Sequence, residues 1–187
     1  MAIHRLVGIQ GSGKGLTMVA MSAYYVENFG GIYQYSDIYA NFHLIFPGSH
    51  YLSNKEMKSH IRKVFATPEN GGRMITREYD NTIILVDEID GIYPQWGYGD
   101  KEARIDLSGA YQDEKMHIQM FCTTHKADNF NKIIRDACEI ITLPYLDKSS
   151  DTLYVTHLDD RYRNIGEQEF HPASVLYDCY DREERVI

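Results

Sequence analysis

The sequence has no apolar run close to the roughly 18 residues that a membrane-spanning helix needs. Polar residues interrupt its first ten residues, MAIHRLVGIQ, too early for a signal peptide. We therefore expect a cytoplasmic protein without a membrane span. Three cysteines in 187 residues form no C-x-x-C pair, so neither a disulfide framework nor a zinc site is predicted. The eight histidines also lack metal-ligand spacing such as H-E-x-x-H.

Positive charge is scarce as well. The net charge of −8 argues against a broad basic face for nucleic acid. The charge does not exclude a local basic patch that lines the pore of an oligomer. The alternative is that these basic residues lie on solvated helix faces. The candidates for that patch are Lys55, Lys58, Arg62, Lys63, Lys101 and Arg104. Fifteen tyrosines favour an aromatic-rich core and surface over a platform for stacking bases.

The sequence does contain a distinctive glycine-rich segment, GIQGSGKGLT at residues 8–17. It follows a predicted strand and opens a predicted helix, which is the setting of a loop that wraps nucleotide phosphates. Glycines let backbone N–H groups turn toward the phosphates, and the helix N-terminus and a lysine add positive charge. The alternative is a tight strand-to-helix turn. The predicted ATP-binding residues are Gln10, Gly11, Ser12, Gly13, Lys14, Gly15, Leu16 and Thr17.

One residue departs from this loop pattern. Gly15 stands where a Ser or Thr hydroxyl normally holds Mg²⁺. Thr17 is rotated by about 200° on the helix, so its hydroxyl is better placed for the α-phosphate side or for a bond within the helix. Mg²⁺ keeps several waters readily, so a water can replace the lost ligand. We expect ATP to bind and hydrolysis to be slow, with Thr at position 15 raising turnover.

A second motif ends the apolar run TIILVDE at residues 82–88. Such a run is typical of a central parallel strand covered on both faces. Asp87 at its end suits a metal-binding carboxylate, and Glu88 suits the residue that activates the attacking water. The alternative is a pair of solvated strand-end carboxylates.

Two further parts are needed for phosphoryl transfer, a γ-phosphate sensor and a cation. Strand 117–124 is expected beside strand 82–88, with Thr123, Thr124 and His125 facing the nucleotide at its carboxyl end. The alternative is that these polar residues simply end a strand. Arg135, on the following helix, is the candidate cation, although a surface salt bridge with Asp136 or Glu139 explains it equally well.

Strands alternate with helices through the first 145 residues, which predicts an α/β fold. Strands are expected at 3–9, 32–40, 82–88, 117–124, 139–145 and 152–158. Helices are expected from Leu16 to about Asn28, at 55–65, at 101–113 and at 129–138, the last capped by Asp128. This predicts a P-loop NTPase fold: a parallel central sheet sandwiched by helices, with a C-terminal antiparallel edge hairpin. The whole chain, 1–187, is expected to be one domain, with a core at 3–158 and a polar C-terminal extension at 159–187.

Several segments together resemble the zonula occludens toxin-like ATPases, near the FtsK–HerA class of DNA-pumping motors. They are GIQGSGKGLT, IYANFHL, IILVDEID, FCTTHKADNFNKIIRDACEII and the closing VLYDCYD. The resemblance covers about residues 3–180 and implies roles at matching positions. Lys14 would bind phosphates, Asp87 the metal and Glu88 the attacking water. His125 stands where the family has a sensor glutamine, and Arg135 matches an arginine of the next helix.

The resemblance also implies ATP and Mg²⁺ as cofactors and double-stranded DNA as partner. Such motors are often hexameric rings that act in genome packaging or virion assembly, which would place the protein in host cytoplasm or with a virion or portal-like protein. Gly15, His125 and the acidic QDEK at 112–115, where the family often has Arg-Lys, depart from the pattern. A nucleotide-binding assembly or regulatory module with little turnover is therefore the main alternative. A small-molecule kinase is a third, with Arg161, Arg163, Arg182 and Arg185 too scattered for an arginine-rich lid.

Overall fold

The computed structural model describes residues 2–67, 81–95, 98–110, 117–124 and 130–180. Within them, eight strands form one sheet in the order β3-β2-β4-β5-β1-β6-β7-β8. The strands are β1 (Ala2–Leu6), β2 (Ile38–Ala40), β3 (His50–Tyr51), β4 (Asn81–Val86), β5 (His117–Thr123), β6 (Ile140–Asp147), β7 (Thr152–Leu158) and β8 (Asn164–Phe170).

Across the sheet, each neighbouring pair from β3 through β2, β4, β5 and β1 to β6 is parallel. Strands β4, β5 and β1 lie at the centre. Residues 82–86 of β4 are all buried, as expected for a strand covered on both faces. β5 lies between β1 and β4, with Leu6 beside Thr123 and Val86 beside Cys122. The carboxyl ends of these three strands therefore meet at one edge of the sheet.

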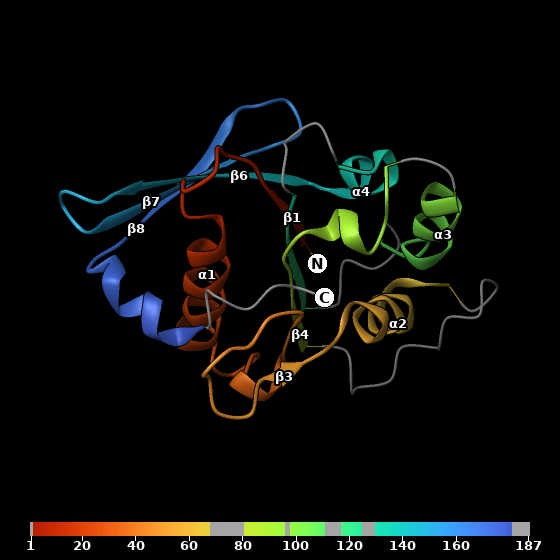
Figure 1. Cartoon of the computed structure of the whole chain (residues 1–187), viewed down its shortest axis with the longest axis horizontal. Coiled ribbons are helices and arrows are strands. Elements are labelled where there is room, and N and C mark those ends of the chain that lie inside the picture. The colour runs from red at the N-terminus through yellow and green to blue at the C-terminus, as the bar shows by residue number, and fades with distance from the viewer. Residues whose placement is uncertain (1, 68–80, 96–97, 111–116, 125–129, 181–187) are drawn as a thin grey trace.

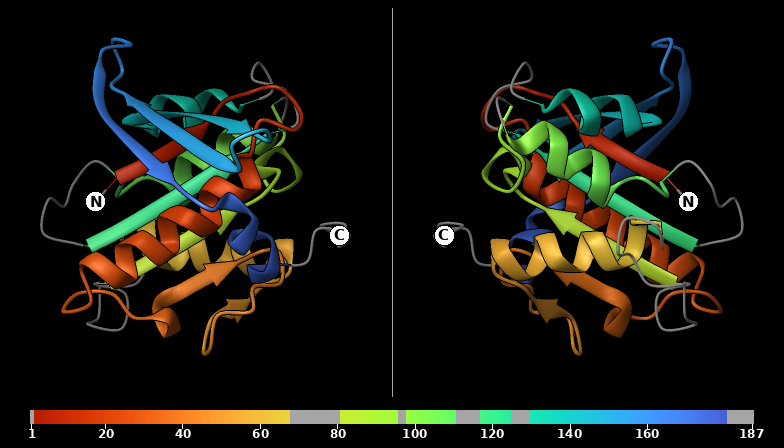
Figure 2. Two further views of the ribbon diagram at one scale, coloured as in Figure 1. Left: turned by 90° about the vertical axis from the view of Figure 1, so that its left-hand side faces the viewer. Right: turned by 90° about the vertical axis from the view of Figure 1, so that its right-hand side faces the viewer.

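Helices cover both faces of this sheet. Figures 1 and 2 show α1 (Lys14–Asn28) on one side of the central strands and α2 (Asn54–Phe65), α3 (Tyr98–Asp106) and α4 (Lys132–Ala137) on the other. The 3-10 segment η6 (Ala173–Cys179) contacts α1. The predicted parallel α/β sandwich is confirmed.

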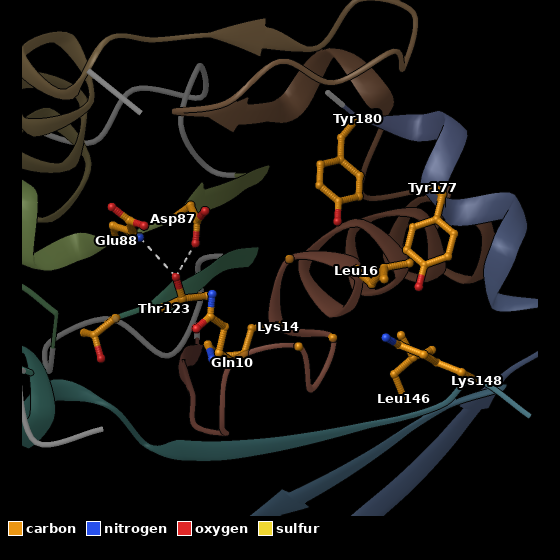
Figure 3. Close-up of a pocket in the computed structure, with 14 residues that line it drawn as sticks. Gln10, Lys14, Leu16, Asp87, Glu88, Thr123, Leu146, Lys148, Tyr177 and Tyr180 are labelled. Carbon is orange, nitrogen blue, oxygen red and sulfur yellow. Dashed lines mark hydrogen bonds between the residues drawn. The ribbon is translucent and has the colours of Figure 1, made fainter. Parts of the chain in front are cut away.

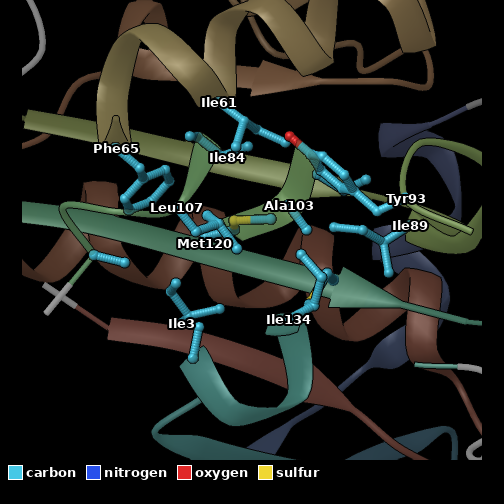
Figure 4. Packing of buried hydrophobic residues seen from close by; sticks show 14 of the residues in the cluster. Ile3, Ile61, Phe65, Ile84, Ile89, Tyr93, Ala103, Leu107, Met120 and Ile134 are labelled. Carbon is cyan, nitrogen blue, oxygen red and sulfur yellow. The ribbon is translucent and has the colours of Figure 1, made fainter. Parts of the chain in front are cut away.

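Alternating residues of the central strands divide the core into two layers. Ile84 and Met120 face α2, α3 and α4, and this cluster is drawn in Figure 4. Ile83, Leu85 and Phe121 face α1, where they pack with buried Met18 and Val19. Both layers bury apolar area from water, which is the main favourable contribution to folding.

Local chemistry sets where the helices begin. Ser53 and Glu56 form a capping box at the start of α2, with the Ser53 N–H donating to the Glu56 carboxylate over 2.9 Å. The predicted helix at 129–138 begins later, at Lys132, because Asn131 accepts the Ile133 N–H over 2.9 Å. The predicted cap Asp128 lies outside the described residues.

The sheet differs from the prediction at three places. β6 and β7 pair antiparallel as expected, but their hairpin is not the edge, because β8 pairs with β7 and adds a further strand. The expected strand 32–40 is reduced to β2, since the Gln34 N–H donates to Asp37 over 2.7 Å and forms the 3-10 turn η1 (Tyr35–Asp37). The two-residue β3 was not predicted. No described helix is both long and apolar enough to cross a membrane.

Candidate functional site

The glycine-rich segment forms a loop between β1 and α1, as its sequence predicts. Gly11 and Gly13 have φ angles of 80° and 96°, in the left-handed region that favours glycine. Gly13 is the N-cap of α1. A side chain there would be 2.9 Å from Leu153 of β7, so the loop also packs closely on the antiparallel strands. The start of α1, where the first N–H groups have no partner within the helix, therefore lies close to β7.

Lys14, the first residue of α1, points back across this loop. Its ammonium group donates to the carbonyl oxygens of Gly8 over 2.8 Å and Ile9 over 3.1 Å. Burial lowers the pKa of Lys14 from its ordinary value, and the Asp87 carboxylate opposes that shift. The positive charge thus lies in the mouth of the loop, electrostatically coupled to the carboxylate across it.

Asp87 and Glu88 follow β4 directly and are tied to the neighbouring strand. The Thr123 hydroxyl, at the end of β5, donates to the Asp87 carboxylate. The Thr123 hydroxyl oxygen also accepts the Glu88 N–H over 3.0 Å. Glu88 has a φ of 55°, an uncommon value for a residue with a side chain. Such strain is often found at functional sites, and here it accompanies the turn that follows Asp87.

Asn41, just after β2, fixes the backbone of Asp87 from the other side. Its side-chain oxygen accepts the Asp87 N–H over 2.7 Å, and its amide group donates to the Asp87 carbonyl over 2.8 Å. Asn41 is buried and also donates to Asn54 over 3.0 Å. Both backbone groups of Asp87 are therefore satisfied by one side chain, which holds the carboxylate at the strand end.

We predict that Asn41→Ala leaves the fold intact and weakens Mg²⁺-dependent ATP binding by about tenfold, the lower end of the effect of residues that orient metal ligands. The reason is that Asp87 loses both backbone partners. Titration with a fluorescent ATP analogue, with Mg²⁺ and with EDTA, measures this. Asn28→Ala is the matched control, because Asn28 is exposed at the end of α1. Equal affinities for Asn41→Ala and the unmodified protein would contradict the role.

These groups converge on a pocket of about 470 Å³ at the carboxyl ends of the parallel strands (Figure 3). One end holds the loop and the carboxylates. The other lies beneath η6 and is lined by Leu146, Lys148 and Tyr177. The full lining is Gln10, Gly11, Gly13, Lys14, Gly15, Leu16, Asp87, Glu88, Thr123, Thr124, Leu146, Lys148, Tyr177 and Tyr180. One end offers a loop lysine and carboxylates and the other offers leucine and tyrosine side chains beside Lys148, which suits a nucleotide with its phosphates on the loop.

Two of the predicted binding residues lie outside this lining. The Thr17 hydroxyl is buried and donates to the Gly13 carbonyl over 2.9 Å, inside the helix. Ser12 has its side-chain oxygen buried near Gly8, and a β-carbon added to Gly8 would come within 2.4 Å of that oxygen. Among described residues, neither side chain reaches the pocket.

The two remaining catalytic candidates are separated from the pocket or undescribed. Arg135 is half-exposed on α4 and lies 3.9 Å from the Asp136 carboxylate, in the salt bridge considered as its alternative. It does not line the pocket of its own chain. His125 and residues 112–115 lie outside the described part of the chain.

The sequence did not single out Asn41, Leu146, Lys148, Tyr177 or Tyr180 as site residues. The two tyrosines belong to VLYDCYD, a segment that carries part of the family resemblance without a predicted role. Asn41 likewise belongs to IYANFHL, another segment of that resemblance, and was given no predicted role, whereas Lys148 stands in no motif. Their parts in the site arise from contacts between segments far apart in the sequence, which local patterns do not report.

The donor set fits a magnesium ion that arrives with a nucleotide. Asp87 offers carboxylate oxygen at the phosphate end, and Mg²⁺ prefers oxygen ligands, phosphates and several waters. In the described part of the chain, no group of three or more His, Cys, Asp and Glu residues could hold a metal by itself. Asp87 would therefore hold Mg²⁺ together with phosphate oxygens.

No protein-family model matches this sequence, and no curated protein matches it. Among solved structures, the N-terminal domain of zonular occludens toxin from Neisseria meningitidis is similar over 96% of this chain and 98% of that chain, with 17% identity and a TM-score of 0.58. The genome packaging NTPase B204 from Sulfolobus turreted icosahedral virus 2, solved with ATP-gammaS, aligns over 92% of this chain and 98% of that chain, with 10% identity and a TM-score of 0.49.

A third similar structure is the flagellar accessory protein FlaH from Methanocaldococcus jannaschii, with 13% identity over 87% of this chain and 79% of that chain and a TM-score of 0.45. The similarity to the zonular occludens toxin domain extends over nearly the whole of both chains. The chain has the P-loop NTPase fold of the zonular occludens toxin N-terminal domain.

Proposed function

We propose that this protein binds ATP with Mg²⁺ in the pocket at the strand ends and hydrolyses it. One observation supports this above the others: the loop lysine and the Asp87-Glu88 pair, about 70 residues apart, line one pocket. In that arrangement Lys14 and the loop N–H groups bind phosphates. Asp87 holds the metal, and Glu88 orients or deprotonates the attacking water.

Hydrolysis is proposed to drive movement of double-stranded DNA by an oligomeric ring, in genome packaging or virion assembly. Each chain of that ring is proposed to be one domain, located in host cytoplasm or beside a virion or portal-like protein. The fold likeness to the zonular occludens toxin domain supports this class of protein. α2 and α3 pack together, which gathers the six basic residues of the predicted patch on neighbouring helices. Lys58 pairs with Glu102 over 2.5 Å and Arg62 with Asp106 over 3.7 Å, so acids offset part of that charge.

In such a ring, Arg135 is proposed to act across a subunit interface. Its exposed position on α4, outside the pocket of its own chain, agrees with that role better than with one in its own chain. His125 stays a proposed γ-phosphate sensor. Both roles belong to a ring, and the experiment with double-stranded DNA described below tests whether that ring forms.

The second candidate is a nucleotide-binding assembly module with little turnover, favoured by the missing hydroxyl at Gly15. The lining of the pocket does not support the kinase alternative, because neither Arg161 nor Arg163 lines the pocket. Arg163 instead pairs with Asp159 over 2.6 Å in the turn between β7 and β8.

ATP hydrolysis measured with and without double-stranded DNA, beside native mass spectrometry, separates the candidates. We expect DNA to raise turnover severalfold and a ring to form with ATP. Tight ATP binding without turnover in either condition would favour the assembly module. Phosphoryl transfer by a monomer to a small acceptor would favour the kinase.

A further inference from the structure

Gly15 is the residue at which this loop departs from its pattern, and the structure shows what lies beside it. A β-carbon built on Gly15 would be 3.4 Å from the hydroxyl oxygen of Tyr180 and 3.7 Å from two of its ring carbons. Both residues line the pocket. Figure 3 shows Tyr180 extending from the end of η6 toward the start of α1, which carries Lys14 and Leu16. Position 15 therefore has a hydroxyl-bearing neighbour from the far end of the sequence.

The position of Tyr180 is set by several contacts. Its backbone forms a β-bridge with Leu44, and the Ile45 N–H donates to the Cys179 carbonyl over 2.9 Å. Its ring packs edge-on against Phe42, with ring centroids 6.0 Å apart. The C-terminal segment is thus attached to the connection between β2 and β3, which holds the tyrosine over the start of α1.

Thr17 does not provide a substitute hydroxyl at this end of the pocket, because it is buried and bonded to Gly13. The Thr123 hydroxyl already joins Asp87 to Glu88. A phenol both donates and accepts hydrogen bonds, as a Ser or Thr hydroxyl does. Tyr180 has the right chemistry beside the residue that lacks it.

We propose that Tyr180 is a nucleotide-binding residue that supplies, from outside the loop, the hydroxyl missing at position 15. Its partner is the metal–phosphate end of Mg²⁺–ATP, either a phosphate oxygen or a metal-bound water. This inference rests on the proposed ATP binding and deepens it. It also explains the glycine, because a hydroxyl-bearing side chain at position 15 would compete with Tyr180 for one space.

The consequence reverses the expectation drawn from the loop alone. Serine or threonine at position 15 should not improve the site while Tyr180 is present, since its β-carbon already touches the phenolic oxygen at 3.4 Å and its hydroxyl would compete with the phenol for the space beyond. Removing only the phenolic oxygen, as in Tyr180→Phe, leaves the ring 3.7 Å from a β-carbon at position 15, which is ordinary contact. Serine should fit there and place its own hydroxyl in the vacated space.

A double-mutant cycle tests this pairing. Affinity for a fluorescent ATP analogue is measured with Mg²⁺ and with EDTA for the unmodified protein, Tyr180→Phe, Gly15→Ser and the double variant. We expect Tyr180→Phe to weaken binding about tenfold, the order of one hydrogen bond to a charged group. Gly15→Ser alone should bind no better than the unmodified protein, whereas adding it to Tyr180→Phe should recover most of the loss. Thermal unfolding of each variant reports whether folding has changed.

Tyr154→Phe is the matched control, because Tyr154 lies on the outer face of β7 and outside the pocket. A tenfold loss seen only with Mg²⁺ supports contact through a metal-bound water, and one seen also with EDTA supports contact with phosphate. Unchanged affinity of Tyr180→Phe, or additive effects in the double variant, would overturn the inference and leave the proposed function standing. If the unmodified protein does not bind ATP, both fall.

Discussion

Replacing Lys14 with alanine should abolish measurable ATP hydrolysis, a loss of at least about 100-fold, and should also weaken ATP binding. The ammonium group lies in the mouth of the loop, where it donates to the carbonyls of Gly8 and Ile9. When phosphates bind, the same group exchanges these neutral acceptors for charged oxygens, which form stronger hydrogen bonds. Without it, the loop N–H groups face the negative charge of ATP alone.

Two measurements check this prediction: steady-state phosphate release, and titration with a fluorescent ATP analogue. Lys63→Ala is the control, since Lys63 is exposed on α2 and its loss removes the same charge from the chain. The role assigned to Lys14 is wrong if Lys14→Ala binds and hydrolyses ATP as the control does. In that case the segment would be only a tight turn between β1 and α1.

The sequence predicted the parts of the site that depend on neighbours along the chain. The loop, the first helix and the buried strand β4 follow from glycine positions and apolar patterns over ten to fifteen residues. The place of β5 beside β4, and so of Thr123 beside Asp87, followed from the fold class, because carboxyl ends of adjacent parallel strands meet at one edge. These predictions needed no knowledge of distant contacts.

The parts that escaped prediction depend on such contacts. β8, with the sequence NIGEQEF, is largely exposed and polar, so it has no apolar alternation, and only its hydrogen bonds to β7 make it a strand. Asn41 is one asparagine among several until β2 lies beside β4. Tyr180 is one of fifteen tyrosines, and only the path of the C-terminal segment across the β2–β3 connection brings it to Gly15.

The role of the Thr17 hydroxyl depends on both the helical geometry read from the sequence and the contacts in the structure. The helical rotation between residues 15 and 17 left two uses open for the Thr17 hydroxyl, one on the phosphate side and one within the helix. The structure has the second, because the Gly13 carbonyl is its nearest helical acceptor and the side chain is buried. A hydroxyl at this position of the site would then come from another segment, and Tyr180 is the hydroxyl-bearing residue beside Gly15.

Glu88→Gln should separate binding from hydrolysis in a way that Lys14→Ala cannot. The amide keeps the size of the side chain and the backbone N–H that donates to Thr123, so ATP affinity should stay within about twofold. It cannot accept a proton from water as a carboxylate does, so turnover should fall by about 100-fold or more. Single-turnover hydrolysis and analogue titration on the same preparation give both quantities, and Glu102→Gln, at an exposed position of α3, is the control.

Such a variant also tests the motor proposal, because ATP that binds and persists should hold any ring in its assembled state. Native mass spectrometry of Glu88→Gln with ATP should therefore show more of the oligomer than the unmodified protein under turnover. Turnover close to that of the Glu102→Gln control would mean that Glu88 is a solvated strand-end carboxylate. Its left-handed backbone conformation would then serve only the turn after β4, and the water-activating group would have to be sought elsewhere.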